Sequence, residues 1–251
     1  MIETTLHITS YNRFKQLKSC VESFFATCKY DMSKLQLVIV DNGSTDKETV
    51  EYIKNLSPPC ADYRFHLNEV NLYPDCLRFA KIQARKMASG NFFFDCPDDH
   101  LFLIKDDYIT DAIDRIKAKS DVGCVIHFAQ PAYRWQKKNN ESVLSECGKF
   151  AISIHKGYAD YHIMSKSVYE DLGEYKYELG RKAEGEYMER SLAAGYKRNV
   201  MLRPVAIVND DSYSLHKAIE KEKYNSHFSS LEGPITNEML IQFAKLNKSI
   251  R

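Results

Sequence analysis

About the first 130 residues of the chain alternate between two hydrophobic patterns. Short runs of β-branched and aromatic residues predict strands at residues 6–9, 35–40, 64–67, 91–94 and 122–128. Between them, apolar residues three or four positions apart predict helices at residues 13–28, 47–55, 75–88 and 108–119. Strands that alternate with helices are typical of an α/β fold with a doubly wound, mostly parallel central sheet.

Length and composition narrow the classes of protein that fit this pattern. The 251 residues contain no internal repeat and no linker rich in proline or glycine, so we expect one large α/β domain. With 35 basic and 34 acidic residues the net charge is +1, which does not favour nucleic acid as a partner. The seven cysteines form no Cys-x-x-Cys pair and are odd in number, so a reducing cytoplasm is the expected location. No apolar run reaches the ~20 residues of a membrane span, and residues 1–13 lack the pattern of a signal peptide.

The strand at residues 35–40 ends abruptly in polar residues. Asp41 follows it directly, and the Asn-Gly pair after Asp41 is typical of a turn. Because ligands of open α/β sheets bind at the carboxyl ends of the strands, we expect Asp41 to accept hydrogen bonds from a nucleobase or a ribose. The alternative is that Asp41 only caps the turn. Thr45 and Glu48 have the spacing of a capping box and predict the start of the next helix.

A second cluster of polar residues follows the aromatic strand at residues 91–94. Asp95, Asp98, Asp99 and His100 lie within six residues. Neighbouring carboxylates repel each other unless a cation or water stabilises them, and oxygen ligands suit Mg²⁺ or Mn²⁺. The cluster therefore predicts a divalent metal site. The alternative is an acidic loop that is simply solvated.

The helix before this cluster carries basic residues at helical spacing. Arg78, Lys81 and Arg85 recur on one face. Such a stripe could offset the charge of a diphosphate, or it could be an ordinary solvated face.

Five motifs, in order, make the sequence similar to family 2 glycosyltransferases with a GT-A fold. They are ITSYNR (8–13), VDNGSTD (40–46), PDD (97–99), DYHIMSKSVYEDLGEY (160–175) and KAEGEYMERSLAAGYK (182–197). The resemblance covers about residues 5–216. It implies a GT-A domain at residues 1–216, with a nucleotide-sugar half at about 1–105 and an acceptor half at 106–216, followed by a helical tail at 217–251.

The resemblance also implies roles for individual residues. The nucleotide-sugar donor would be bound by Thr9, Tyr11, Asn12, Arg13, Asp41, Ser44, Lys81 and Asp98. Mn²⁺ or Mg²⁺ would be held by Asp99 and His216, and the general base would be Glu184. Glu184 also heads a predicted helix whose apolar residues can pack inward, which places its carboxylate at a helix N-terminus. The sequence departs from the family pattern at Pro97, Ala183, Ile82 and Ala84.

The expected reaction is transfer of a sugar from a nucleotide diphosphate, with UDP assumed, to a hydroxyl of a saccharide or lipid-linked acceptor, with inversion. This is chemistry of polysaccharide biosynthesis. One alternative is a catalytically silent GT-A domain that binds a glycan or scaffolds other proteins. A sugar nucleotidyltransferase is a weaker alternative, because such an enzyme would be expected to have a glycine-rich loop after the first strand, where this chain has Ser10-Tyr11-Asn12-Arg13.

The last residues form a third region with a pattern of its own. Ile235, Met239, Leu240, Phe243 and Leu246 have helical spacing after Pro234. We expect this helix to dock onto the domain. The alternatives are peripheral contact with a membrane that carries a lipid-linked acceptor, and a homodimer interface.

Overall fold

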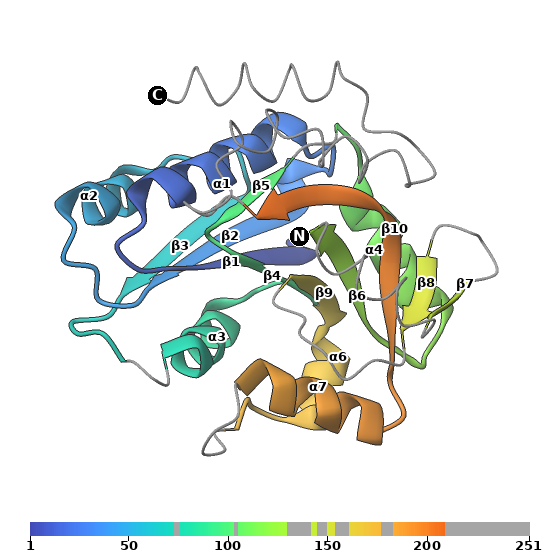
Figure 1. The fold of residues 1–251 in the computed structure, drawn as a ribbon. Helices are drawn as coiled ribbons and strands as arrows, with labels where there is room; N and C mark the ends of the chain where they lie inside the picture. Colours follow the sequence, from blue (N-terminus) through green and yellow to red (C-terminus); the bar gives the residue numbers. More distant parts are fainter. Residues whose placement is uncertain are drawn as a thin grey trace, which may run out of the picture.

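The computed structural model describes residues 1–72, 76–102, 105–129, 142–144, 150–153, 161–176 and 183–208. Within these residues, ten strands form one sheet in the order β3-β2-β1-β4-β9-β6-β10-β8-β7, and β5 pairs with β10 (Figure 1). The strands are β1 (Thr4–Ser10), β2 (Leu35–Asp41), β3 (Asp62–Leu67), β4 (Phe92–Pro97), β5 (His100–Phe102), β6 (Val122–Ala129), β7 (Ser142–Leu144), β8 (Phe150–Ser153), β9 (His162–Ser165) and β10 (Lys197–Val208).

The sheet has a parallel half and a mixed half. Strands β3, β2, β1 and β4 are all parallel, so their carboxyl ends meet at one edge. Strand β9 then lies antiparallel to both β4 and β6, and β10 is parallel to β6 but antiparallel to β5 and β8. The parallel half contains the strand ends from which a ligand site was expected.

Helices cover both faces of the sheet, which confirms the doubly wound α/β fold (Figure 1). Helices α1, α2 and α4 pack on one face, and helices α3, α6 and α7 pack on the other. Their bounds are α1 (Phe14–Thr27), α2 (Lys47–Asn55), α3 (Cys76–Met87), α4 (Tyr108–Ala118), α6 (Lys166–Leu172) and α7 (Ala183–Ala193). The helices and strands predicted before residue 129 are all present within a few residues of the expected bounds.

Strand β2 shows why apolar residues follow one another without alternation at residues 37–40. Leu37 and Ile39 pack toward α1, whereas Val38 and Val40 pack toward Ala80 of α3. Every residue of β2 is buried. A strand covered on both faces has no solvent-facing side, so it carries no polar alternation.

The capping box predicted for α2 is wrong by one residue. The N-cap of α2 is Asp46, whose carboxylate accepts hydrogen bonds from the backbone N–H of Glu48 and Thr49. A carboxylate reaches both orphan donors of the first turn from this position, so the Thr45 hydroxyl is not needed there. The N–H of Thr45 instead donates to Asn12 Oδ1 at 2.8 Å.

Several predictions fall on residues outside the described ranges. These are His216, the helical tail at 217–251 and its docking, membrane or dimer alternatives. Within the described part of the chain, none of the helices combines the length and apolar character that crossing a bilayer requires.

Candidate functional site

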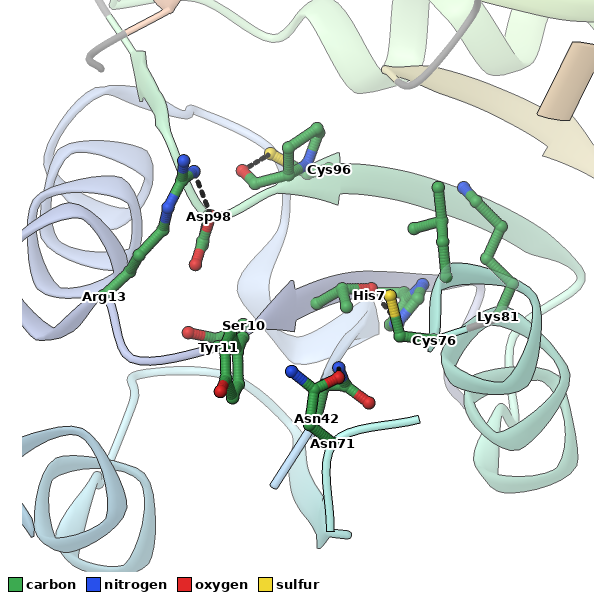
Figure 2. Close-up of a pocket in the computed structure, with 13 residues that line it drawn as sticks. His7, Ser10, Tyr11, Arg13, Asn42, Asn71, Cys76, Lys81, Cys96 and Asp98 are labelled. Atoms are coloured by element: carbon green, nitrogen blue, oxygen red, sulfur yellow. Dashed lines mark hydrogen bonds and ion pairs between the residues drawn. The ribbon is translucent and has the colours of Figure 1, made fainter. Parts of the chain in front are cut away.

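A cavity of about 420 Å³ opens at the carboxyl ends of β1, β2 and β4 (Figure 2). Its wall is made by residues of these strand ends, of the loops that follow them and of α3. The lining residues are His7, Thr9, Ser10, Tyr11, Arg13, Asn42, Asn71, Cys76, Leu77, Lys81, Cys96, Pro97 and Asp98. The cavity therefore lies where the topology predicts a ligand, at the edge where the parallel strands end.

An acidic turn forms one end of the cavity. Asp98 and Asp99 are the two residues between β4 and β5, and Arg13, just before α1, reaches both of them. The Arg13 Nη1 atom lies 3.3 Å from Asp98 Oδ1 and 3.2 Å from Asp99 Oδ2. His100 lies on the far side, with its Nδ1 3.1 Å from Asp99 Oδ1. Arg13 and His100 thus contact these two adjacent carboxyl groups from two different chain segments.

The carboxyl groups of Asp98 and Asp99 differ in pKa. Burial raises the pKa of Asp98 to about 6, because the nearby charge of Arg13 only partly offsets the loss of water. Burial also acts on Asp99, but the hydrogen bond from His100 and the charge of Arg13 outweigh it and lower the pKa of Asp99. Asp99 is therefore the stronger acid of the pair, while Asp98 retains its proton into mildly acidic conditions.

The turn offers oxygen ligands that fit a divalent cation. Asp98 lines the cavity, and its Oδ2 atom is buried without a hydrogen-bond partner of normal geometry among the described residues, although the Ser10 hydroxyl lies close enough to lower its pKa. Hard carboxylate oxygens of this kind suit Mg²⁺ or Mn²⁺, which draw further ligands from substrate phosphates. In the described part of the chain no group of three potential metal ligands occurs, so a metal would depend on ligands beyond Asp98 and Asp99.

A buried ionic cluster lies beneath the cavity on the side of α3. Asp95 is only 1% exposed, and its Oδ2 atom lies 3.1 Å from Lys81 Nζ and 2.7 Å from Arg85 Nη2. Burial alone would raise the pKa of Asp95, but Arg85 and Lys81 hold it well below its usual range. The alternative of a solvated basic face is therefore wrong for Lys81 and Arg85, because both side chains point into the protein and compensate Asp95.

Asp95 also belongs to a different place from Asp98 and Asp99. In β4 alternate side chains face opposite sides of the sheet, so Asp95 faces α3 together with Phe93. The sequence run of carboxylates thus divides into a structural cluster and a turn at the cavity. Lys81 connects the two, because it pairs with Asp95 and also lines the cavity.

The opposite end of the cavity is built on the turn after β2. The Asp41 carboxylate accepts the backbone N–H and the hydroxyl of Ser44, at 2.7 and 2.5 Å. The backbone of Asn12 has a positive φ of 52°. Its side-chain oxygen Oδ1 accepts hydrogen bonds from the backbone N–H groups of Thr45 and Asp46. Asp41, Asn12 and Ser44 therefore hold the loops together at this end, and the residues that line the cavity do not include them.

Asn42 and Asn71 form the wall that was expected from Asp41. Asn42 Nδ2 donates to Asn71 Oδ1 at 2.7 Å, and Asn42 Oδ1 accepts the N–H of Leu72 (Figure 2). Gly43 makes this contact feasible: its φ is +78°, and a Cβ there would lie 2.4 Å from the carbonyl carbon of Val70. The motif glycine thus allows the β3–α3 loop to approach the end of β2.

Five of the residues that the sequence predicts at the donor site line the cavity: Thr9, Tyr11, Arg13, Lys81 and Asp98. Other lining residues were not predicted. His7, Asn42, Asn71 and Cys76 also line the cavity. His7 was the detectable omission, since a histidine among apolar residues in a strand two positions before Thr9 shares its face. Asn71 follows β3 by several residues, and no local pattern indicates that its loop folds back.

The region expected to supply the general base lies at the start of α7. Glu184 is the second residue of this helix. Further along, Arg190 pairs with Glu186 through two hydrogen bonds of 2.8 and 3.0 Å and also donates to the carbonyl groups of Leu172 and Glu174. The hydrogen bonds to these carbonyl groups fix α7 to the end of α6, which lies on the same face of the sheet as α3 (Figure 1).

Comparison with known proteins identifies the family. The model of glycosyl transferase family 2 matches residues 5–173, which is more than half of the chain. The chain belongs to this family. A search of curated protein sequences found no significant match.

Solved structures of similar fold agree with this assignment. Mannosyltransferase PcManGT from Pyrobaculum calidifontis, in complex with GDP-Man and Mn²⁺, superimposes with a TM-score of 0.63 and 15% identity over 99% of this chain and 69% of that one. S. aureus TarS 1-349, in complex with UDP-GlcNAc, superimposes with a TM-score of 0.63 and 16% identity over 99% of this chain and 73% of that one. GalNAc-T7 with UDP, GalNAc and Mn²⁺ superimposes with a TM-score of 0.58 and 13% identity over 80% of this chain and 42% of that one. The family 2 glycosyltransferase and its GT-A fold are therefore as the sequence predicted.

The raised pKa of Asp98 leads to a test of the cavity by stability. The native pKa of about 6 lies above the unfolded value, so native Asp98 binds protons more tightly and its contribution to stability is lost as the pH rises through 4 to 6. Asp98→Asn removes this penalty. We expect the free energy of unfolding of the variant, relative to the native chain, to be similar at pH 4 and about 2 kcal/mol higher at pH 8.

Urea denaturation in buffer with a metal chelator measures this difference. Asp114→Asn, on the exposed surface of α4, is the control and should show no such dependence. A variant that is less stable than the native chain at pH 8, or a difference that does not change with pH, would contradict the burial of an unfavourable carboxylate in the cavity.

Proposed function

We propose that the chain transfers a sugar from a nucleotide diphosphate to an acceptor hydroxyl, with the cavity as the donor site. The observation that carries the proposal is the division of the cavity into an acidic end and a polar, uncharged end. The Asp98–Asp99 turn and Arg13 form the first, and Asn42 and Asn71 form the second. A diphosphate with its cation suits the first end, and a nucleoside suits the second.

Donor binding then divides among the lining residues. Tyr11, whose side chain is exposed at the cavity, offers a ring for the nucleobase, and Thr9 offers a hydroxyl. Lys81 and Arg13 face the diphosphate as cations. In this arrangement Asp41, Asn12 and Ser44 shape the nucleoside end from behind, since their hydrogen bonds are made within the turn.

The metal in this proposal is Mn²⁺ or Mg²⁺. Asp99 and His216 would hold it, with Asp98 close by. A bound divalent cation would offset the negative charge that develops on the departing nucleotide diphosphate. Two of the solved structures similar in fold contain Mn²⁺ with a nucleotide or nucleotide sugar, which supports this choice of cation.

The chain's own residues prepare the transfer in two ways. Lys81 and Arg13 orient the diphosphate, so that the bond between the anomeric carbon and the phosphate oxygen can break. Glu184 takes the proton of the acceptor hydroxyl as its oxygen forms the new bond from the opposite face, which inverts the configuration. The proton ends on Glu184, and the electron pair of the broken bond leaves with the diphosphate.

The acceptor in the proposal is a hydroxyl of a saccharide or of a lipid-linked saccharide. The rival is a silent domain that binds a glycan without turnover. The two differ in one product: transfer releases free nucleoside diphosphate, whereas glycan binding alone does not.

A thermal-shift panel tests the donor site. We expect one of UDP, GDP, CDP and dTDP to raise the melting temperature in the presence of Mn²⁺, because ligand that binds only the native state stabilises it by mass action. Asp99→Ala should remove the part of the shift that depends on Mn²⁺, whereas Asp114→Ala should leave it unchanged. The donor site is contradicted if none of the four nucleotides shifts the melting temperature.

A second test addresses the general base. Glu184→Gln should retain the nucleotide-induced shift but lower the rate of transfer by roughly 10²- to 10⁴-fold, since the amide cannot accept the proton. The rate is measured as nucleoside diphosphate released from the matching sugar donor with an acceptor present. Glu170→Gln, at an exposed position of α6, is the matched control. Transfer at nearly the native rate by Glu184→Gln would remove Glu184 from this role.

A further inference from the structure

A line of three hydrogen-bonding side chains leads from the buried Asp95 to the wall of the cavity. His7 Nδ1 lies 3.1 Å from Asp95 Oδ1, and His7 Nε2 lies 3.2 Å from Thr9 Oγ1. His7 and Asp95 are register partners on the parallel strands β1 and β4, and each is 1% exposed. His7 and Thr9 share a face of β1 because they are two residues apart, and both line the cavity.

The direction of these hydrogen bonds is fixed by their chemistry. Lys81 and Arg85 keep Asp95 ionised, so its carboxylate can only accept, and His7 must carry a proton on Nδ1. Burial lowers the pKa of His7 by more than Asp95 raises it, so the ring is neutral and Nε2 accepts. The single hydroxyl proton of Thr9 is therefore donated to His7. Only the lone pairs of Thr9 Oγ remain for a ligand.

This arrangement is more than a way to fill the space between β1 and α3. Further polar side chains converge on Asp95 here, since His162 Nε2 lies 3.6 Å from Asp95 Oδ2 and the Tyr175 hydroxyl donates to the same oxygen at 3.4 Å. Well-packed apolar residues in such a place are often at least as stable as a buried ionic cluster. The cluster instead fixes one atom of the cavity wall, Thr9 Oγ, as a hydrogen-bond acceptor. A fixed acceptor can discriminate between ligands that do and do not offer a hydrogen at this point.

We propose that His7 and Asp95 are positioning residues that hold Thr9 Oγ as an acceptor for a hydrogen of the bound nucleoside. This inference rests on the proposed function. The hydrogen comes either from an N–H of the base or from an O–H of the ribose, and both present the same donor chemistry. A nucleoside atom that is itself only an acceptor is rejected at this point, because two acceptors would face each other without a proton.

Two substitutions of His7 separate positioning from packing. In His7→Gln the amide reaches the position of Nε2 and can still accept from Thr9. In His7→Asn the shorter amide reaches only the position of Nδ1 and can serve Asp95 but not Thr9. We expect His7→Asn to weaken nucleotide binding roughly tenfold and His7→Gln to weaken it less than about threefold, the range of a single hydrogen bond.

A double-mutant cycle shows whether the effect passes through Thr9. The dissociation constant is measured by calorimetry for whichever of UDP, GDP, CDP and dTDP gives the largest thermal shift, with Mn²⁺ present. Thr9→Val should weaken binding roughly tenfold, and adding His7→Asn to it should cost less than about twofold more. Thr5→Val is the matched control: Thr5 lies on the same strand and donates to Gln36 away from the cavity, so its substitution should leave the dissociation constant unchanged.

The two sources of the hydrogen are distinguished by the ligand. If the ribose donates it, the 2′- or 3′-deoxy form of the same nucleotide binds roughly tenfold more weakly to the native chain and equally well to Thr9→Val. If the base donates it, the deoxy forms show no such difference. The free energy of unfolding of every variant is measured in parallel, so that loss of folding is recognised.

Three results would overturn the inference. Equal losses for His7→Asn and His7→Gln indicate packing alone. Additive losses for His7→Asn and Thr9→Val indicate that His7 does not act through Thr9. If the native chain binds none of the four nucleotides, the proposed donor site itself fails, and that failure is recognised before any variant is compared.

Discussion

The architecture of the site depends on the buried carboxylate of Asp95. Lys81 and Arg85 reach it from α3, His7 reaches it from β1, and His162 approaches it from β9. Its ion pairs and polar contacts therefore join a helix to three adjacent strands of the sheet. Removing one partner of a buried ion pair generally costs about 3–5 kcal/mol, because the remaining charge is left without compensation. The same contacts place Lys81 and Thr9 at the cavity, so a structural interaction sets the geometry of ligand binding.

Carboxylates that are close in sequence lie in different surroundings at the site. Asp95 and Asp98 are three residues apart, yet one is held inside by cations and the other lies at the cavity. Arg85 and Lys81 lower the pKa of the first, whereas burial raises the pKa of the second. A run of carboxylates that looks uniform in sequence thus has two physical roles: Asp95 anchors α3, and Asp98 forms the acidic end of the cavity.

The fold could be predicted because its signals are local. The apolar run of β2, the helical spacing of α1 and the alternation of elements each follow from the period of hydrophobic residues. The acidic turn and Lys81 could also be found, since strand ends of a parallel sheet share one edge. The ion pair of Lys81 with Asp95 could not be predicted. Helical spacing alone does not distinguish a helix face that packs on an ionic cluster from one that faces water. Asp41 was placed at the correct strand end, but the two hydrogen bonds that its carboxylate accepts from Ser44 could not be predicted. Asn71 reaches the cavity because its loop folds back over Gly43. A contact of this kind does not show in the periodicity of hydrophobic residues.

The central claim is that a nucleotide diphosphate occupies the cavity between the Asp98–Asp99 turn and the Asn42–Asn71 pair. A crystal structure with Mn²⁺ and the nucleoside diphosphate that stabilises the protein most tests it directly. We expect the diphosphate beside Asp98, Asp99 and Lys81, with the nucleoside against Tyr11, Thr9 and Asn42. A nucleotide bound elsewhere on the protein, or bound here with its base at the acidic turn, would contradict the proposed donor site.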